Sequence, residues 1–126
     1  RFIVLPFEYG LCRLHPDDAA PLWPIASSFY SITKTPGEWS VVCEVKHVPD
    51  GIQCSKGWRL LKIAAVLDLS LTGITAKFSA ALADAGVNLC VIATYDTDYI
   101  LIPNEKLSAA VAALQEGGFI IQSDIK

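Results

Sequence analysis

The chain has 126 residues, 52% of them hydrophobic, and a mean hydropathy of +0.41, which is enough apolar material for one ordinary domain or two very small ones. A net charge of −3 and a pI near 5.2 give no cationic surface for nucleic acid or an anionic membrane. The apolar runs are interrupted by charges, so none approaches the ~20 residues that span a bilayer, and the opening residues lack a signal-peptide cleavage site. We therefore expect a cytoplasmic protein that binds neither nucleic acid nor membranes.

The first half of the chain is predicted to contain strands joined by turns and one weak helix. Pro21 and Pro24 limit the helix in residues 19–27 to one or two turns. Adjacent Pro and Gly within residues 34–37 predict a hairpin turn. The predicted strands are residues 2–6, 9–14, 29–33 and 39–45.

The second half is predicted to be a complete βαββαβ unit. Apolar residues recur at helical spacing after Ile74 and again after Leu107. Gly86 and the pair Gly117 and Gly118 can end these helices. The predicted strands are residues 58–66, 87–94, 99–102 and 119–121. Two helices on one face of a four-stranded antiparallel sheet form the ferredoxin-like arrangement.

The two halves share an order of elements, which indicates a degenerate internal repeat. Residues 48–56 show no periodicity and are rich in turn formers, so they are predicted to be a linker. The predicted units are therefore residues 1–47 and 57–126. The predicted fold is α+β, with two packed ferredoxin-like units. The first unit is incomplete, because it lacks a second helix and a last strand.

The sequence offers no obvious catalytic group. It has no nucleophile elbow, Walker-type loop, His-Glu-x-x-His or Cys-x-x-Cys motif, so we expect neither an enzyme nor a cofactor. The cysteines are scattered and no His stands at metal-ligand spacing, which favours packed, reduced thiols over redox or metal sites. Asp96 and Asp98 could be read as a metal-binding or acid–base pair, although acidic residues in a turn are usually turn formers.

Two segments together resemble the ACT domain family. They are residues 68–74 (Asp-Leu-Ser-Leu-Thr-Gly-Ile) and residues 94–101 (Thr-Tyr-Asp-Thr-Asp-Tyr-Ile-Leu). The resemblance is to small bacterial tandem-ACT proteins and, more distantly, to aspartokinase regulatory regions and CASTOR-type amino-acid sensors. It covers the second half and, more weakly, the first. It implies two ACT units that hold a free amino acid between them, a regulated protein partner on another chain, and pairing that is compatible with a homodimer.

The residues themselves give a physical reason for amino-acid binding. A helix that starts after residues 70–74 offers unpaired backbone amides and a favourable dipole to the ligand carboxylate, and Gly73 permits close approach. Asp98, or Asp96, can accept hydrogen bonds from the ligand ammonium. The hairpin of the first half would supply the second wall. The predicted ligand-binding residues are Ser70, Leu71, Thr72, Gly73, Ile74, Tyr95, Asp96, Asp98, Thr35, Glu38, Trp39 and Ser40.

Simpler interpretations stay open. Asp, Ser and Thr before a helix are ordinary caps, and aromatic residues are usually core or interface residues. In a second hypothesis the chain is a ligand-free assembly module, with Trp39, Tyr95 and Tyr99 at a subunit interface. The first half has no equivalent of residues 70–74, so we expect one asymmetric site. The ligand is also open, because Trp39 suggests an apolar pocket whereas Glu38 could select a cationic side chain.

Overall fold

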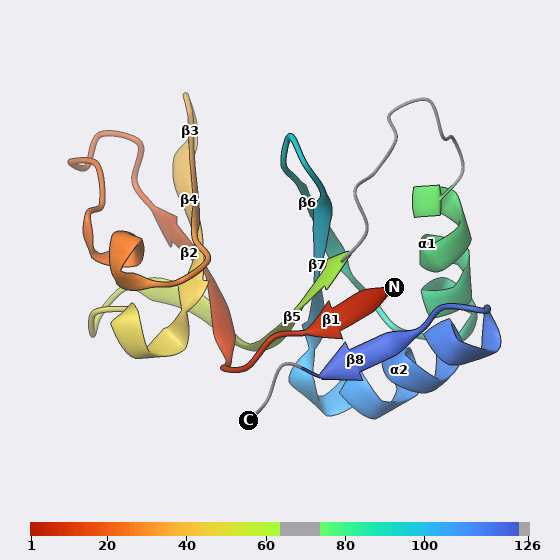
Figure 1. Cartoon of the computed structure of the whole chain (residues 1–126). Coiled ribbons are helices and arrows are strands. Elements are labelled where there is room, and N and C mark those ends of the chain that lie inside the picture. The colour runs from red at the N-terminus through yellow and green to blue at the C-terminus, as the bar shows by residue number, and fades with distance from the viewer. Residues whose placement is uncertain (64–73, 124–126) are drawn as a thin grey trace. The chain divides into compact units, whose positions relative to one another are not determined.

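The structure is a computed structural model that describes residues 1–63 and 74–123. It divides into two compact units, and each is described by itself below. The C-terminal unit consists of Arg1–Pro6 and Arg59–Lys126, and the N-terminal unit is Phe7–Trp58. Figure 1 labels the strands and the two α-helices, numbered in chain order.

The C-terminal unit contains both α-helices and every strand that follows β5 in the chain. The elements are the last part of β5 (Gln53–Ile63), α1 (Ile74–Asp84), β6 (Cys90–Ala93), β7 (Asp98–Pro103), the 3-10 helix η3 (Asn104–Lys106), α2 (Leu107–Glu116) and β8 (Ile121–Ser123). The order β5-α1-β6-β7-α2-β8 is the predicted βαββαβ order. The predicted α+β, ferredoxin-like fold is therefore confirmed.

A strand from the beginning of the chain lies inside this sheet. β1 (Phe2–Val4) pairs antiparallel with β5, with Phe2 opposite Ile63, and parallel with β8, with Phe2 opposite Ile121. The sheet order in this unit is therefore β8-β1-β5-β7-β6, one strand more than predicted. The unit boundary also differs from the predicted one, which placed residues 1–6 with the first half. A short apolar strand carries no signal for which sheet it joins, because its partners are set by tertiary packing.

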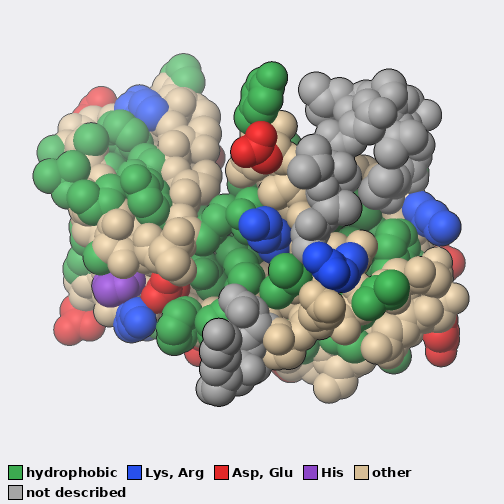
Figure 2. All heavy atoms as spheres, viewed as in Figure 1, with side chains coloured by type: hydrophobic (Ala, Val, Ile, Leu, Met, Phe, Trp, Pro, Cys, Tyr) green, Lys and Arg blue, Asp and Glu red, His purple; other side chains and the backbone are tan. Residues whose placement is uncertain are grey.

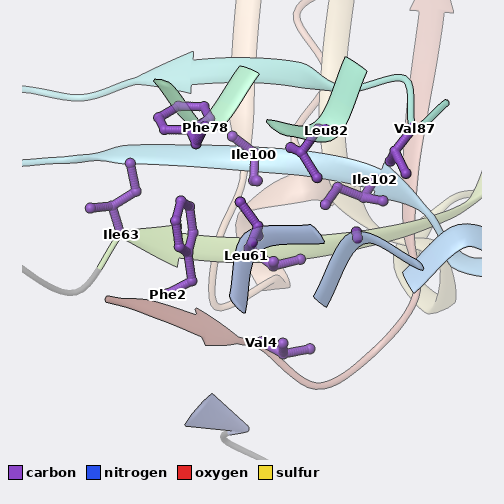
Figure 3. Close-up of a cluster of buried hydrophobic side chains, with 11 residues drawn as sticks. Phe2, Val4, Leu61, Ile63, Phe78, Leu82, Val87, Ile100 and Ile102 are labelled. Atoms are coloured by element: carbon purple, nitrogen blue, oxygen red, sulfur yellow. The ribbon is translucent and has the colours of Figure 1, made fainter. Parts of the chain in front are cut away.

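The core of the C-terminal unit lies between this sheet and the two helices (Figure 3). Side chains alternate along a strand, so Phe2, Leu61 and Ile63 face the helices. The ring of Phe2 meets the ring of Phe78 from α1 edge-to-face, with centroids 5.6 Å apart. The other buried core residues are Val4, Leu82, Val87, Ile100, Ile102, Ala110 and Leu114.

Both helices end as their sequences predict. Gly86 follows α1 with a φ of +74°, and Gly118 follows α2 with a φ of +92°. Val87 N donates to Leu82 O at 2.9 Å, and Phe119 N donates to Leu114 O at 2.9 Å. These bonds belong to the Schellman motif, in which a left-handed residue reverses the chain.

The N-terminal unit is an antiparallel sheet with two short 3-10 helices. Its elements are β2 (Tyr9–Leu14), η1 (Trp23–Ala26), β3 (Ser31–Thr35), β4 (Glu38–Glu44), η2 (Val45–His47) and the first part of β5. The strand order is β3-β4-β2-β5. The predicted hairpin is present, and η1, which contains Pro24, is the weak helix that the prolines allow. Gln53, Cys54 and Ser55, predicted as linker, instead pair with β2. The polar Gln53 and Ser55 and the left-handed Gly57 hide the strand pattern.

Glu44 is a buried acid within the N-terminal unit and is 3% exposed. Its Oε2 accepts hydrogen bonds from Ser28 N at 2.9 Å and Ser28 Oγ at 3.1 Å, and its Oε1 lies 3.3 Å from Lys46 Nζ. Burial alone would raise the pKa of Glu44. The bonds from Ser28 and the ammonium of Lys46 outweigh it, so the pKa lies below the ordinary value of 4.5.

We expect Glu44→Gln to lower the free energy of unfolding at pH 7 by about 1–3 kcal/mol, because the amide replaces a charge-assisted acceptor. A carboxyl whose folded pKa is depressed contributes stability above its unfolded pKa and loses it as the pH falls through the folded pKa. The wild type should therefore lose stability on acidification below about pH 4.5, and Glu44→Gln should lose less. Urea denaturation between pH 3 and 7 measures this, with Asp50→Asn as an exposed control. Equal pH dependence of wild type and Glu44→Gln would contradict the assignment.

Candidate functional site

The turn between β6 and β7 is held by a small set of threonine hydrogen bonds. Ala93 and Asp98 form the closing pair of the hairpin. Thr94 N and Thr94 Oγ1 both donate to Thr97 O at 2.8 Å, and Thr97 N donates to Thr94 Oγ1 at 3.2 Å. The turn that precedes Asp98 therefore has a fixed backbone, as expected where Thr side chains replace ladder bonds.

Thr97 also ties this turn to the neighbouring strand. Its side chain is 7% exposed, and its Oγ1 donates to Ile63 O at 2.6 Å. Ile63 is the last residue of β5, from which the chain continues into residues 64–73. The Thr97 hydroxyl thus positions the start of β7 against the end of β5. The sequence prediction did not include Thr97, because its acceptor is distant in the sequence.

We expect Thr97→Val to lower the free energy of unfolding of the C-terminal unit by about 1–3 kcal/mol, because it leaves the buried carbonyl of Ile63 without its donor. Thr97→Ser keeps the hydroxyl and loses one methyl group, so it should cost only about 0.8 kcal/mol. Chemical denaturation of the three proteins measures the difference. Equal losses in the Val and Ser variants would show that the hydroxyl contributes nothing.

Asp98 is the predicted acceptor for the ligand ammonium, and the structure places it at the first position of β7. Its side chain is half-buried, and no described residue pairs with its carboxylate. Asp96 is exposed within the turn, and the ring of Tyr95 is 93% exposed. Of the two acidic residues, Asp98 lies on a strand next to the buried Thr97, whereas Asp96 lies in the exposed turn.

Five of the predicted ligand-binding residues stand at positions 70–74 of the sequence. Ser70, Leu71, Thr72 and Gly73 lie outside the described residues, as does the side chain of Ile74. Ile74 itself is the first residue of α1. The first backbone N–H groups of any α-helix have no acceptor within the helix. The start of α1 is therefore a described element that could bind a carboxylate.

The other predicted residues lie in the N-terminal unit, at the hairpin of β3 and β4. Thr35 Oγ1 accepts from Gly37 N at 3.2 Å and from Glu38 N at 3.1 Å, which closes the turn. Trp39 Nε1 donates to Asp18 O at 3.0 Å, so the indole fixes the loop after β2. Ser40 is paired within the sheet. The polar atoms of Thr35 and Trp39 thus already serve the unit's own turns.

The C-terminal unit also has cavities away from these residues. One of about 320 Å³ lies beside α2 and contains Arg59, whose Nη2 donates to Leu5 O at 3.1 Å. The Arg59 Nε is buried and has no partner in the described part of the chain. Another of about 310 Å³ lies between the ends of α1 and α2. Neither cavity is lined by a predicted ligand-binding residue.

Residues 1–63 and 74–123 contain no group of three or more His, Cys, Asp or Glu side chains that could hold a metal ion. No helix among them has the length and apolar character needed to cross a membrane.

Comparison with known proteins identifies the C-terminal region. A family model described as the ACT domain matches residues 53–116, which is half of the chain. A second family model, described as an N-terminal domain, matches residues 8–51. The cytosolic arginine sensor for mTORC1 subunit 1 of Homo sapiens and that of Pongo abelii are each 28% identical over 99 residues. The match covers 70% of this chain, which spans 30% of the length of those relatives.

Solved structures share the fold over nearly the whole chain. A crystal structure from Agobacterium tumefaciens has 27% identity, covers 99% of this chain and 93% of its own, and gives a TM-score of 0.93. A Vibrio cholerae protein of unknown function has 24% identity, coverage of 92% and 88%, and a TM-score of 0.75. The ligand-free regulatory subunit of Thermus thermophilus aspartate kinase has 16% identity, coverage of 87% and 91%, and a TM-score of 0.58.

These matches confirm the resemblance that the sequence motifs carry. The family model spans the βαββα part of the C-terminal unit and the first residues of β5. The structures from Agobacterium tumefaciens and Vibrio cholerae share the fold over 99% and 92% of this chain at low sequence identity. The chain therefore belongs to the ACT domain family.

Proposed function

We propose that the chain is a regulatory module, rather than an enzyme, that binds a free α-amino acid at its C-terminal ACT unit. The proposal rests on the position of the Asp98 carboxylate and on its lack of a partner among the described residues. Its carboxylate stands at the start of β7, half-buried and unpaired among the described residues, beside a turn that Thr97 ties to the end of β5. A carboxylate with no partner among residues 1–63 and 74–123 is a ready acceptor for an ammonium group.

In this proposal the two charged groups of the ligand are bound by different elements. Asp98 accepts from the ammonium, and the N–H groups at the start of α1 donate to the carboxylate, helped by the helix dipole. Residues 70–74, to which the sequence assigns this second contact, lead directly into α1. Recognition of both groups would distinguish a free amino acid from an amine or a simple acid.

The names of two relatives support regulation. The curated relative is described as an arginine sensor, and one structural relative as a regulatory subunit of aspartate kinase. We extend regulation to this chain, acting on a partner protein that is a separate chain. The contribution of Thr35, Glu38, Trp39 and Ser40 to the ligand's side-chain pocket stays a prediction, as do a homodimer and a cytoplasmic location.

The proposal is tested by a thermal-shift screen of the purified chain against each common amino acid in its L and D forms. A ligand that binds only the folded state stabilises it, by about 2.7 kcal/mol at a concentration of 100 times its Kd. We expect one amino acid, or one chemical class, to raise Tm in the L form only. A flat panel at millimolar concentrations with a well-folded protein would overturn the proposal.

A protein–protein assembly module is a second candidate, and exposed apolar side chains on the N-terminal unit favour it. Leu22 is 73% exposed and Ile25 is 57% exposed, three residues apart at η1. Figure 2 shows hydrophobic side chains gathered on the surface of this unit. If this surface binds protein, Leu22→Ser with Ile25→Ser should change the oligomeric state in light scattering while leaving any amino-acid response intact.

A further inference from the structure

Two cysteines that are far apart in the sequence face each other in the N-terminal unit. Cys12 of β2 is directly opposite Cys54 of β5 in the antiparallel pairing. Their Sγ atoms are 2.9 Å apart, and neither cysteine is part of a disulfide bond. A disulfide bond is about 2.05 Å long, so the sulfur atoms need to approach by less than about 1 Å to form one.

The neighbouring residues make room for this pair. A Cβ atom added at Gly10 would lie 2.6 Å from Cys54 Sγ, so glycine at this position leaves the space that the Cys54 sulfur occupies. Cys12 is 2% exposed and packs with Val41 and Cys43, whereas Cys54 is half-buried at the edge of the same cluster. The pair therefore consists of one buried cysteine and one partly exposed cysteine.

Burial also separates the cysteines chemically. It raises the pKa of Cys12, and the nearby Cys54 raises it further through a hydrogen bond and its charge. It likewise raises the pKa of Cys43 to about 11. A thiol is nucleophilic as its thiolate, so Cys12 and Cys43 are poor starting points for reaction. Cys54, the more exposed member, is where a reaction with a dissolved reagent would begin.

We propose that Cys12 and Cys54 are a site of reversible disulfide modification by a small disulfide such as oxidised glutathione. The Cys54 thiolate attacks one sulfur of oxidised glutathione, forms a mixed disulfide and releases one glutathione, which takes up the proton that Cys54 lost. Cys12 then loses its proton and attacks Cys54 Sγ, which releases the second glutathione. Two protein thiols are oxidised to one disulfide, and one glutathione disulfide is reduced to two thiols.

The new bond would tie β2 to β5 and close a loop between residues 42 positions apart in the sequence. Cross-linking restricts the unfolded chain, more so for longer loops. Oxidation should therefore raise the Tm of the N-terminal unit by about 5 °C or more, provided that the bond forms with little strain.

The test incubates the full chain in mixtures of reduced and oxidised glutathione, quenches it with acid, alkylates the remaining thiols, and identifies linked peptides by mass spectrometry without reduction. We expect a Cys12–Cys54 linked peptide that increases with the proportion of oxidised glutathione, while Cys43 and Cys90 stay alkylated. The proposal is overturned if all four thiols stay alkylated at the highest proportion. A link through Cys43, or a stable glutathione adduct on Cys54 beside alkylated Cys12, overturns it as well.

Two variants separate the roles within the pair. Cys12→Ala should stop the reaction at the mixed disulfide, so that Cys54 carries one glutathione and Tm does not rise. Cys90→Ala lies outside the pair and should form the same link as wild type. If circular dichroism shows that Cys12→Ala does not fold, the linked peptide of the wild type decides the question alone.

Discussion

Phe2→Ala is expected to lower the free energy of unfolding of the C-terminal unit by about 3–5 kcal/mol, the usual cost of removing a buried aromatic side chain. Phe2 is 1% exposed, and its ring meets those of Phe78 and Phe119 edge-to-face at 5.6 and 5.4 Å. β1, which carries it, pairs with both β5 and β8. The substitution would therefore leave a cavity in the core and weaken the strand that joins those two.

Hydrogen exchange resolves which unit Phe2 stabilises. Phe2→Ala should lower protection of the amides in α2, β7 and β8 and leave those of β3 and β4 unchanged. Phe7→Ala is the control, because Phe7 is 50% exposed and belongs to the N-terminal unit. A loss of amide protection confined to β3 and β4 would contradict the pairing of β1 with β5 and β8. It would instead support the unit boundary expected from sequence, with residues 1–47 as one unit.

Asp98→Asn is expected to weaken amino-acid binding about 10- to 100-fold, because a hydrogen bond to a charged group contributes about 1.5–3 kcal/mol. Asparagine keeps the size of the side chain and the position at the start of β7, so stability should change little. Calorimetric titration of wild type and variant with the amino acid found in the screen measures the loss.

The matched control for Asp98 is Asp96→Asn. Asp96 is exposed in the turn and carries the same charge two residues earlier, so its variant changes the net charge equally. Binding should be nearly unchanged in Asp96→Asn. If both variants lose affinity to the same extent, general electrostatics rather than a contact at Asp98 explains the effect; if neither does, the ammonium is bound elsewhere.

Local signals in the sequence predict a large part of the fold. The glycines after α1 and α2 end those helices because only a left-handed residue reverses the chain there, and this requirement depends on a few neighbouring residues. The turn at Pro36 and Gly37 is equally local, and Thr35 closes it. The hairpin around Asp98 is also predicted, although Asp98 was expected in the turn and is instead the first residue of β7.

Features that depend on distant pairing are not predicted. The placement of β1, the strand character of residues 53–56, the bond from Thr97 to Ile63 and the meeting of Cys12 with Cys54 all join residues far apart in the chain. The sequence shows whether each of these side chains is apolar, polar or small, but not which distant residue it meets. Thr35 closes its own turn and Trp39 binds the distant carbonyl of Asp18, and the ligand-binding prediction included neither structural role.

The most direct test of the central claim is calorimetric titration of the full chain with the amino acid that the screen identifies and with two of its derivatives. The N-acetyl derivative removes the ammonium, and the methyl ester removes the carboxylate. We expect saturable binding of the free amino acid, with both derivatives at least about tenfold weaker because each loses one charged contact. Undiminished binding of either derivative, or no heat from any amino acid at millimolar concentration, would contradict amino-acid recognition by Asp98 and the start of α1.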